Sequence, residues 1–374
     1  MTKLSSHLYL ANGTQLGRDA EVLRRASIAN AAMVKSGVRP ILTLRHFARD
    51  SELSYDYLRK VVRRGVDDYE TIKRKKDDGS FRFISSPRPD LMHAQRWLLE
   101  HVLGNLDLHE AAFAYRKGVS IVHCAEVHVG AKWLVKMDLH NFFGEISESR
   151  VYSVFRNLNL SPLLSFEIAR ICTRVPSEAE MTGKVRLFSA YSQHAEGVLP
   201  QGAPTSGAIA NAVATALDVK LDAIASRRGF VYTRYSDDLT MSTHEKISRD
   251  DASKLIADFA RAIHGAGFRV HSNKTRVITP GARKVVLGLL VGDRNVRLLP
   301  EFKRQVLNHI RGVRNNGLVA HAAHRRFRSS LSMVNYLDGC LAFAHGVDRE
   351  WAAAATSSWR EALTNDGFLD SAGV

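Results

Sequence analysis

Hydrophobic residues in the first part of the chain recur at helical spacing. Between residues 41 and 64, the apolar positions with roughly this spacing are Leu44, Phe47, Leu53, Leu58 and Val61. A break at Asp50–Ser51 offers an N-cap for a second helix. We therefore expect residues 1–70 to form a helical region.

After this region the pattern becomes mixed. Two strand-like runs, one ending at Lys75–Lys76 and one starting at Ser80, flank an Asp78–Gly79 turn and predict a β-hairpin. An amphipathic helix is expected over residues 90–105. Strand-like runs then follow at 132–137, 230–235, 239–242 and 285–291, and helical runs at 206–225 and 248–266. This alternation predicts an α+β lobe with an antiparallel sheet, and the pattern is helical from Pro300 onward.

Composition narrows the class of protein. Of the 374 residues, 45% are hydrophobic and 24% charged, which excludes a disordered chain and allows a large core. Three cysteines, Cys124, Cys172 and Cys340, lie far apart without a CxxC pair, as is typical of a reducing compartment. The sequence has no signal-peptide stretch and no apolar run of the roughly eighteen residues that a membrane helix needs. We expect a cytoplasmic protein with no membrane partner.

Charge points to a polyanionic partner. Lys and Arg number 53 against 38 Asp and Glu, a formal net charge of +15. Basic residues are concentrated in two stretches, 59–76 and 297–328. Two separate basic surfaces suggest a long polyanion held at two places, and nucleic acid is the expected partner.

Three aspartates are placed for metal chemistry. Asp138 ends an apolar strand run, where a carboxylate can stay ionised and bind a hard cation. Asp237 and Asp238 meet at a hairpin tip, where a divalent cation would relieve the repulsion between them. Together, the three could hold two Mg²⁺ about 4 Å apart, as in-line phosphoryl transfer requires. Adjacent aspartates also occur at 67–68, 77–78 and 250–251, so the pair by itself is not specific.

A third segment, residues 197–218, places a Pro- and Gly-rich loop before a helix of small residues, with Thr205 or Ser206 as N-cap. Small residues allow close approach of a backbone or a base, and a helix N-terminus favours phosphate. In chain order, MDLHNFF (137–143), LPQGAPTS (199–206) and YSDD (235–238) resemble motifs A, B and C of reverse transcriptases. Further segments, among them DGSFRFISSP and HSNKTRVITP, extend a resemblance to bacterial retron-type enzymes over about residues 40–350.

The resemblance implies a fold and a domain division. It predicts an α+β right-hand polymerase with a palm on a ferredoxin-like antiparallel sheet. Residues 1–70 would form an N-terminal helical basic region, residues 71–295 the fingers and palm, and residues 296–374 a helical thumb. Four C-terminal histidines lack ligand-like pairing with cysteines or carboxylates, so we expect them on a basic RNA-facing surface: His309, His321, His324 and His345.

The resemblance also implies roles in the active site. Asp138, Asp237 and Asp238 would be the metal-binding catalytic residues, and Leu139 would add a backbone carbonyl. Residues implied near the incoming nucleotide are Phe143 as a steric gate against the ribose 2′-OH, Gln201 near the sugar and base, Arg82 at the triphosphate and Lys274 as proton donor to pyrophosphate.

Further implied contacts are with nucleic acid. Tyr235 would pack beneath the primer end, with Ser236 facing the groove. Four residues fit two motifs that retron enzymes use to recognise their own RNA: Ala125, His128, Val286 and Gly288. Cys124 and Leu287 depart from those motifs, in which the family has Asn and Thr.

The activity implied is RNA-directed DNA synthesis from dNTPs with two Mg²⁺. A retron-type enzyme copies a cognate non-coding RNA, which is both template and primer, into a branched RNA–DNA hybrid (msDNA). Such systems commonly serve antiphage defence with an effector protein encoded nearby. The alternatives are a non-retron bacterial defence enzyme, a group II intron-like enzyme, and a non-catalytic RNA-binding protein that kept the fold.

Overall fold

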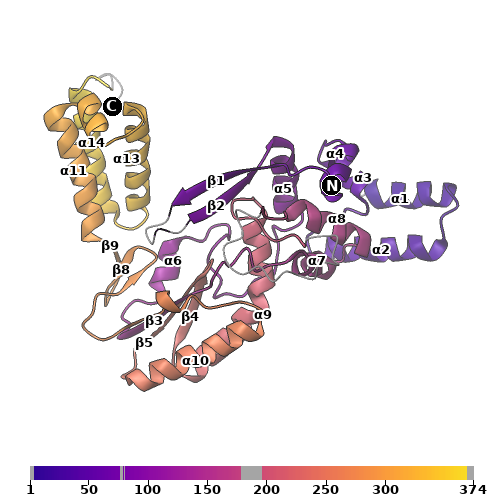
Figure 1. Ribbon diagram of the computed structural model, residues 1–374, viewed down its shortest axis with the longest axis horizontal. Helices are drawn as coiled ribbons and strands as arrows, with labels where there is room; N and C mark the ends of the chain where they lie inside the picture. Colours follow the sequence, from indigo (N-terminus) through magenta and orange to yellow (C-terminus); the bar gives the residue numbers. More distant parts are fainter. Residues whose placement is uncertain (1–3, 76–78, 80, 178–195, 369–374) are drawn as a thin grey trace.

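The computed structural model describes residues 4–75, 79, 81–177 and 196–368 (Figure 1). Its α-helices are α1 (Leu4–Gln15), α2 (Ala20–Lys35), α3 (Leu44–Asp50), α4 (Tyr55–Val62), α5 (Pro89–His101), α6 (Ile121–Glu126), α7 (Glu148–Asn157), α8 (Pro162–Cys172), α9 (Ser206–Arg227), α10 (Arg249–Gly265), α11 (Pro300–Asn316), α12 (Leu318–His324), α13 (Ser330–His345) and α14 (Arg349–Asn365). Its strands are β1 (Tyr69–Lys75), β2 (Phe81–Pro87), β3 (Trp133–Asp138), β4 (Val231–Tyr235), β5 (Asp238–Thr243), β6 (Arg276–Ile278), β7 (Val285–Val286), β8 (Leu289–Val291) and β9 (Val296–Leu298).

A four-stranded antiparallel sheet, the central sheet, forms the middle of the molecule in the order β4-β5-β3-β6. In β3, Lys136 alone is not fully buried, so this strand is an almost continuous apolar run rather than an alternating one. Helix α9 packs against β4 and against α10 (Figure 1). The predicted strands 132–137, 230–235 and 239–242 and the helices at 206–225 and 248–266 are confirmed to within two residues at each end.

One hydrophobic core joins the central sheet to the N-terminal helices. It extends in sequence from Met33 to Phe268 and includes fully buried Phe47 of α3 and Leu58 of α4. Ion pairs reinforce this contact, because Arg59 binds Glu167 of α8 at 3.2 Å. The N-terminal helices are therefore packed onto the rest of the chain; the predicted division at residue 70 stays a prediction.

A second ionic contact follows α4. Arg64 binds Glu148 at the start of α7 at 2.6 Å, and its Nη2 also donates to the Thr173 hydroxyl at 2.7 Å. Arg170 of α8 binds the other oxygen of Glu148 at 3.1 Å. Glu148 is thus held between a cation from the N-terminal helices and one from the helix beside it.

The N-cap predicted at Asp50–Ser51 for the helix that the structure shows as α4 is wrong. Helix α4 is capped by Ser54, whose hydroxyl accepts from the Tyr57 backbone. Ser51 instead ends α3, and its hydroxyl donates to the carbonyl of Phe47 at 2.7 Å. A serine can serve either end of a helix, so its position alone does not distinguish the two.

The hairpin β1–β2 forms as predicted, with Lys75 opposite Phe81. Its expected turn falls largely outside the described residues, since Lys76, Asp78 and Ser80 are not among them. In Figure 1 the hairpin extends from α5 toward the C-terminal helices.

The predicted single strand over 285–291 is wrong. The segment forms two short strands, β7 and β8, joined by a two-residue turn at Leu287–Gly288. Both turn residues have positive φ, 49° and 79°, as a type I′ hairpin turn requires. Strand β9 completes a three-stranded sheet, the small sheet, in the order β7-β8-β9. The apolar run hides this turn, and Gly288 is its one local sign.

Helices α11–α14 form the C-terminal bundle, which has its own core and stands at the opposite end from α1–α4 (Figure 1). The helical pattern predicted from Pro300 is confirmed. His309 and His321 do not lie on an exposed surface as predicted, because both are buried, with Nδ1 of His309 3.2 Å from Nε2 of His321. His321 packs against Gly312, where any Cβ would overlap the imidazole. His324 and His345 are exposed.

No helix in the described part of the chain combines the length and the apolar character needed to cross a membrane.

Candidate active site at the end of the central sheet

Three aspartates lie at one end of the central sheet, on two neighbouring strands and the turn beside them. Asp138 is the last residue of β3 and Asp238 the first of β5, and the two are opposite each other in the antiparallel register. Asp237 lies in the two-residue turn between β4 and β5. Its carbonyl accepts a hydrogen bond from the Leu139 backbone N–H at 2.9 Å. The antiparallel pairing therefore gathers residues that are far apart in sequence.

The site disfavours negative charge in the absence of a bound cation. Burial raises the pKa of Asp237, and the Asp138 carboxylate raises it further. Burial also raises the pKa of Asp238, outweighing the nearby ammonium of Lys136. Two acids with raised pKa values beside a third are expected where a cation normally offsets the charge.

A lysine supplies one positive charge to this site. Lys274, at the end of a 3₁₀ turn over Ser272–Lys274, donates from Nζ to Oδ2 of Asp138 at 2.9 Å. The turn is fixed to the site because the His271 backbone N–H donates to the Asp138 carbonyl at 2.7 Å. The structure thus brings Lys274 to the carboxylates, as the resemblance implied.

Whether these residues suit a metal can be judged from their donors. In the ranges that the structure describes, no three acidic, histidine or cysteine side chains converge as a ready ion-binding group. One carboxylate oxygen of Asp138, Oδ2, is paired with the Lys274 ammonium. Carboxylate oxygens are the ligands that a hard divalent ion prefers, and Asp138 already accepts a cationic group from Lys274, so the donors present fit such an ion.

A buried network holds the turn that carries Asp237. The guanidinium of Arg234 binds both carboxylate oxygens of Asp218 on α9, at 2.8 and 2.7 Å, and both side chains are wholly buried. The same guanidinium donates from Nη1 to Asn211 Oδ1 at 2.9 Å and to the Ser236 carbonyl at 3.2 Å. Ser236 has a φ of 61°, unusual for serine, so this turn needs support from its surroundings.

Tyr115 is a site residue that the sequence analysis missed. Its hydroxyl lies 3.0 Å from that of Ser236, and its ring meets the Phe143 ring edge-on at 6.1 Å between centroids. Gly207 of α9 makes room for it, since any Cβ there would overlap the ring. The Ser236 side chain is therefore buried against Tyr115 instead of facing an open groove. The paired glycine and aromatic could be found only with the fold in hand.

The loop before α9 packs against the hairpin β1–β2. The Gln201 carbonyl accepts from the Ser85 backbone at 2.7 Å. Gly202 has a φ of 116°, and a Cβ there would lie 3.0 Å from the Ser85 carbonyl, so only glycine fits comfortably. Arg82 lies three residues before Ser85 on the same strand and is exposed. The structure thus joins the hairpin of Arg82 to the loop of Gln201.

The aromatic pair after Asp138 divides as expected. Phe142 is buried in the core, whereas Phe143 is half-buried beside Tyr115. Tyr235 ends β4 directly opposite Asp238 and is also half-buried. These placements leave Tyr235 paired with Asp238, and Phe143 against Tyr115, whose hydroxyl contacts Ser236.

Three of the four residues implied in RNA recognition are buried, and the fourth, Gly288, is exposed in the turn between β7 and β8. Ala125 and Val286 are fully buried in one apolar cluster. His128 is fully buried too, with its ring nitrogens 2.7 Å from the Ser242 hydroxyl and 2.8 Å from the Thr233 hydroxyl. Burial lowers the pKa of His128 to about 4, so the imidazole is neutral. All three side chains are buried and do not face the solvent. Their role in RNA recognition stays a prediction, and they would fulfil it by shaping the fold.

Comparisons with known proteins agree on one family. Residues 73–311 match the family described as reverse transcriptase (RNA-dependent DNA polymerase). The chain is 41% identical over 224 residues to the retron Mx162 reverse transcriptase of Myxococcus xanthus, covering 58% of this chain and 45% of that protein. It is 25% identical over 329 residues to the retron Ec86 reverse transcriptase of Escherichia coli, covering 87% and 91%. The retron Ec73 reverse transcriptase of E. coli is 31% identical over 289 residues, covering 73% and 81%. The chain thus spans less than half of the first relative and most of the other two.

Proposed function

The chain belongs to the reverse transcriptase (RNA-dependent DNA polymerase) family, and from this premise we propose that it synthesises DNA on an RNA template at Asp138, Asp237 and Asp238. The predicted resemblance to retron-type enzymes and the predicted α+β polymerase fold are confirmed. The observation that carries the proposal is the register of the central sheet, which sets Asp138 opposite Asp238 beside the Asp237 turn.

The carboxylates and the Leu139 carbonyl would hold two Mg²⁺. When bound, such ions lower the pKa of the attacking primer hydroxyl and offset charge on the leaving phosphates. Arg234 and Asn211 hold the Asp237 turn in place, so the acids need little reorganisation. Lys274 would leave Asp138 and give a proton to the departing pyrophosphate.

The surrounding side chains would select and orient the nucleotide. Phe143, supported by Tyr115, would close against a ribose 2′-OH and so favour dNTPs. Gln201 would lie near the sugar and base, and Arg82 would bind the triphosphate through its guanidinium. Tyr235 would pack beneath the primer end.

We further propose that the enzyme acts in a retron. Its template and primer would be a cognate non-coding RNA, its product a branched RNA–DNA hybrid (msDNA), and its role antiphage defence with an effector encoded nearby. The retron relatives support this over a non-retron defence or group II intron-like enzyme. The three free cysteines suit the cytoplasm. A non-catalytic RNA-binding protein would have no use for buried acids with raised pKa values.

Primer extension tests the active site directly. With a DNA-primed RNA template, Mg²⁺ and dNTPs, Asp237→Asn and Asp138→Asn should each lower incorporation by a factor on the order of 10³ or more, since such residues act as a unit. Binding of the same template should be retained. Asp250→Asn, in an exposed Asp pair on α10, is the matched control and should be fully active. Synthesis that survives Asp237→Asn would show the assignment to be wrong.

Nucleic acid bound in cells tests the retron proposal. The protein is purified from cells carrying its native locus, with Asp237→Asn in parallel, and the bound nucleic acid is sequenced. A short DNA joined to RNA, absent from the variant, is the expected result. Linear DNA without a branch would be consistent with the polymerase proposal but would contradict the retron proposal.

A further inference from the structure

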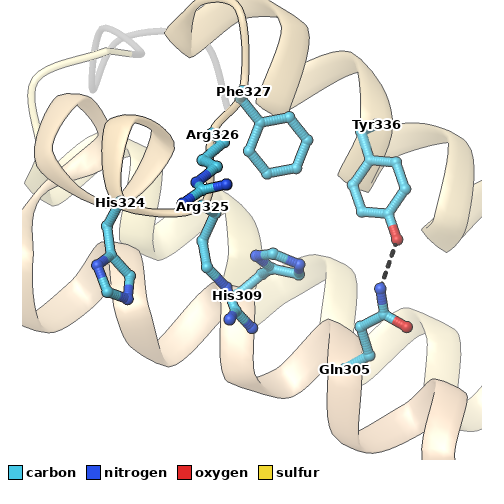
Figure 2. Close-up of a pocket in the computed structure, with 7 residues that line it drawn as sticks. All are labelled: Gln305, His309, His324, Arg325, Arg326, Phe327 and Tyr336. Atoms are coloured by element: carbon cyan, nitrogen blue, oxygen red, sulfur yellow. Dashed lines mark hydrogen bonds between the residues drawn. The ribbon is translucent and has the colours of Figure 1, made fainter.

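The C-terminal bundle contains a pocket that the proposed polymerase reaction does not use. Its volume is about 420 Å³, within the range that holds small ligands. It opens between α11, the end of α12 and α13, and Figure 2 shows aromatic, amide and basic side chains around it. The site of Asp138, Asp237 and Asp238 shares no lining residue with it.

One side of the pocket is aromatic. The rings of Phe327 and Tyr336 lie 5.5 Å apart between centroids with a tilt of 48°, and His309 lies 5.8 Å from each (Figure 2). Tyr336 is 38% exposed, so part of its surface is open to a ligand. Gln305 fixes the ring by donating from Nε2 to the Tyr336 hydroxyl at 2.9 Å. These rings provide an ordered apolar surface that is still accessible.

The opposite side is basic. Arg325 and Arg326 follow α12, both are exposed, and neither forms an ion pair with any residue that the structure describes. Arg326 has a φ of 59°, at a helix end where glycine is usual. The backbone N–H of Phe327 donates to the Ala322 carbonyl at 2.9 Å, so this strained turn is well formed.

The histidine between the two sides is held neutral. Burial lowers the pKa of His309, and the charges of Arg325 and the neighbouring His321 lower it further. Nδ1 of His309 is paired with Nε2 of His321 at 3.2 Å, which leaves Nε2 of His309 for a ligand. A neutral imidazole and the Gln305 amide each offer a donor and an acceptor, as the edge of a base requires.

The aromatic surface and the amide match the base of a nucleotide, and the unpaired guanidinium groups match its phosphate. We propose that this pocket binds a single unpaired nucleotide of the RNA, with its base against Phe327 and Tyr336 and its phosphate on Arg325 and Arg326. Unpaired bases stacked on aromatic rings are the usual basis of sequence-selective RNA recognition. An RNA strand is favoured over a free nucleotide because the bundle carries other exposed arginines, Arg311 and Arg328, for the flanking phosphates. The inference rests on the proposed function for the identity of the polymer.

Binding of two matched RNA hairpins to the full-length protein tests the pocket. One hairpin carries a single unpaired 2-aminopurine nucleotide, and the other is fully paired. Tyr336→Leu and Arg325→Ala should each weaken binding of the first by about tenfold and leave the second within about twofold. Tyr336→Phe keeps the ring and should bind as the wild type does. Arg360→Ala, which removes an exposed charge from α14, should affect both hairpins equally.

Fluorescence of the 2-aminopurine reports stacking separately from affinity. It should be quenched on binding to the wild type and to Tyr336→Phe, but not to Tyr336→Leu. Equal binding of the two hairpins by the wild type, or equal loss for both in Tyr336→Leu, would overturn the proposal. Binding of AMP alone without discrimination between the hairpins would assign the pocket to a free nucleotide and also overturn it.

Primer extension on the same preparations separates this inference from the proposed function. The pocket variants should extend a DNA primer on an unstructured RNA template as the wild type does. If the wild type extends the primer but does not discriminate between the hairpins, only the pocket proposal is contradicted. Discrimination without extension by the wild type would contradict the polymerase proposal and leave the pocket supported.

Discussion

When no cation is bound, ionisation of the Asp237 carboxyl group lowers the stability of the folded protein. Burial raises its pKa, and the Asp138 carboxylate raises it further. The folded protein therefore binds more protons than the unfolded chain between the ordinary and the raised pKa. Stability falls as the pH rises through that interval and stays lower above it.

Asp237→Asn should consequently stabilise the metal-free protein. At neutral pH in EDTA we expect the free energy of unfolding to rise by about 1 kcal/mol, as is common when a destabilising charged group is removed from an active site. The gain should disappear at a pH below the ordinary Asp pKa, where both states are protonated. Urea unfolding at the two pH values measures this, with exposed Asp250→Asn as control. A variant less stable than the wild type at neutral pH would contradict the electrostatic account.

At the residue scale, the strand-end positions of the three aspartates could be predicted from the sequence, but the side chains that support them could not. Asp138, Asp237 and Asp238 stand at strand ends that the hydrophobic pattern already indicates. Tyr115 acquires its position from Gly207 and Ser236, which are distant in sequence and meet it only in the fold. His309 and His321 look like surface histidines until the packing of α11 on α12 buries them.

Among the elements, α9 and the β4–β5 turn are coupled through Arg234. Arg234→Met would leave Asp218 buried without its cation, which should lower the free energy of unfolding by about 3–5 kcal/mol. Adding Asp218→Asn removes that charge and keeps an acceptor for the Tyr232 hydroxyl, so most of the stability should return.

Activity should not return in that double variant. The bonds from Arg234 to Asn211 and to the Ser236 carbonyl are absent in it, so the Asp237 turn loses its support. We expect a lower kcat at saturating dNTP and a higher Mg²⁺ requirement, measured by primer extension. Full activity in the stable double variant would show that Arg234 has only a structural role.

The Leu287–Gly288 turn gives a second prediction at this scale. Gly288 has a φ of 79°, so Gly288→Ala should destabilise the protein by about 1 kcal/mol. Gly339 lies inside α13 with open space around it, and Gly339→Ala should be neutral or stabilising by up to about 1 kcal/mol. Thermal unfolding of the two variants measures the contrast, and equal effects would argue against a strained turn.

Long elements were predictable because their pattern repeats over many residues. The helices α9 and α10 and the strands β3, β4 and β5 belong to this class, whereas the three-residue strand β6 was not predicted. The small sheet was not predictable, because β7 and β8 are too short to show an alternating hydrophobic pattern. Only the backbone conformation of the turn separates the two strands. The cap of α4 was misplaced for a related reason, because Ser51 and Ser54 are both acceptable caps locally.

For the whole molecule, a net charge of +15 makes RNA affinity sensitive to salt. Arg311 and Arg328 are exposed on the C-terminal bundle and have no ion-pair partner among the residues described. Arg311→Gln and Arg328→Gln should each reduce the slope of log affinity against log salt by about one. Arg283→Gln is the control, because Glu301 already neutralises that arginine at 2.6 Å. Equal changes in all three variants would contradict a phosphate-binding face on the bundle.

The packing of the N-terminal helices limits how the protein can be shortened. A fragment starting at residue 71 would lose Phe47 and Leu58 from the core and leave the apolar side of α8 in water. Glu167 would lose Arg59, and Glu148 would lose Arg64. Such a fragment contains every residue proposed to touch substrate and is still expected to aggregate on expression. A minimal active enzyme should therefore begin upstream of Met33, even though Arg82 is the first residue that we propose to touch substrate.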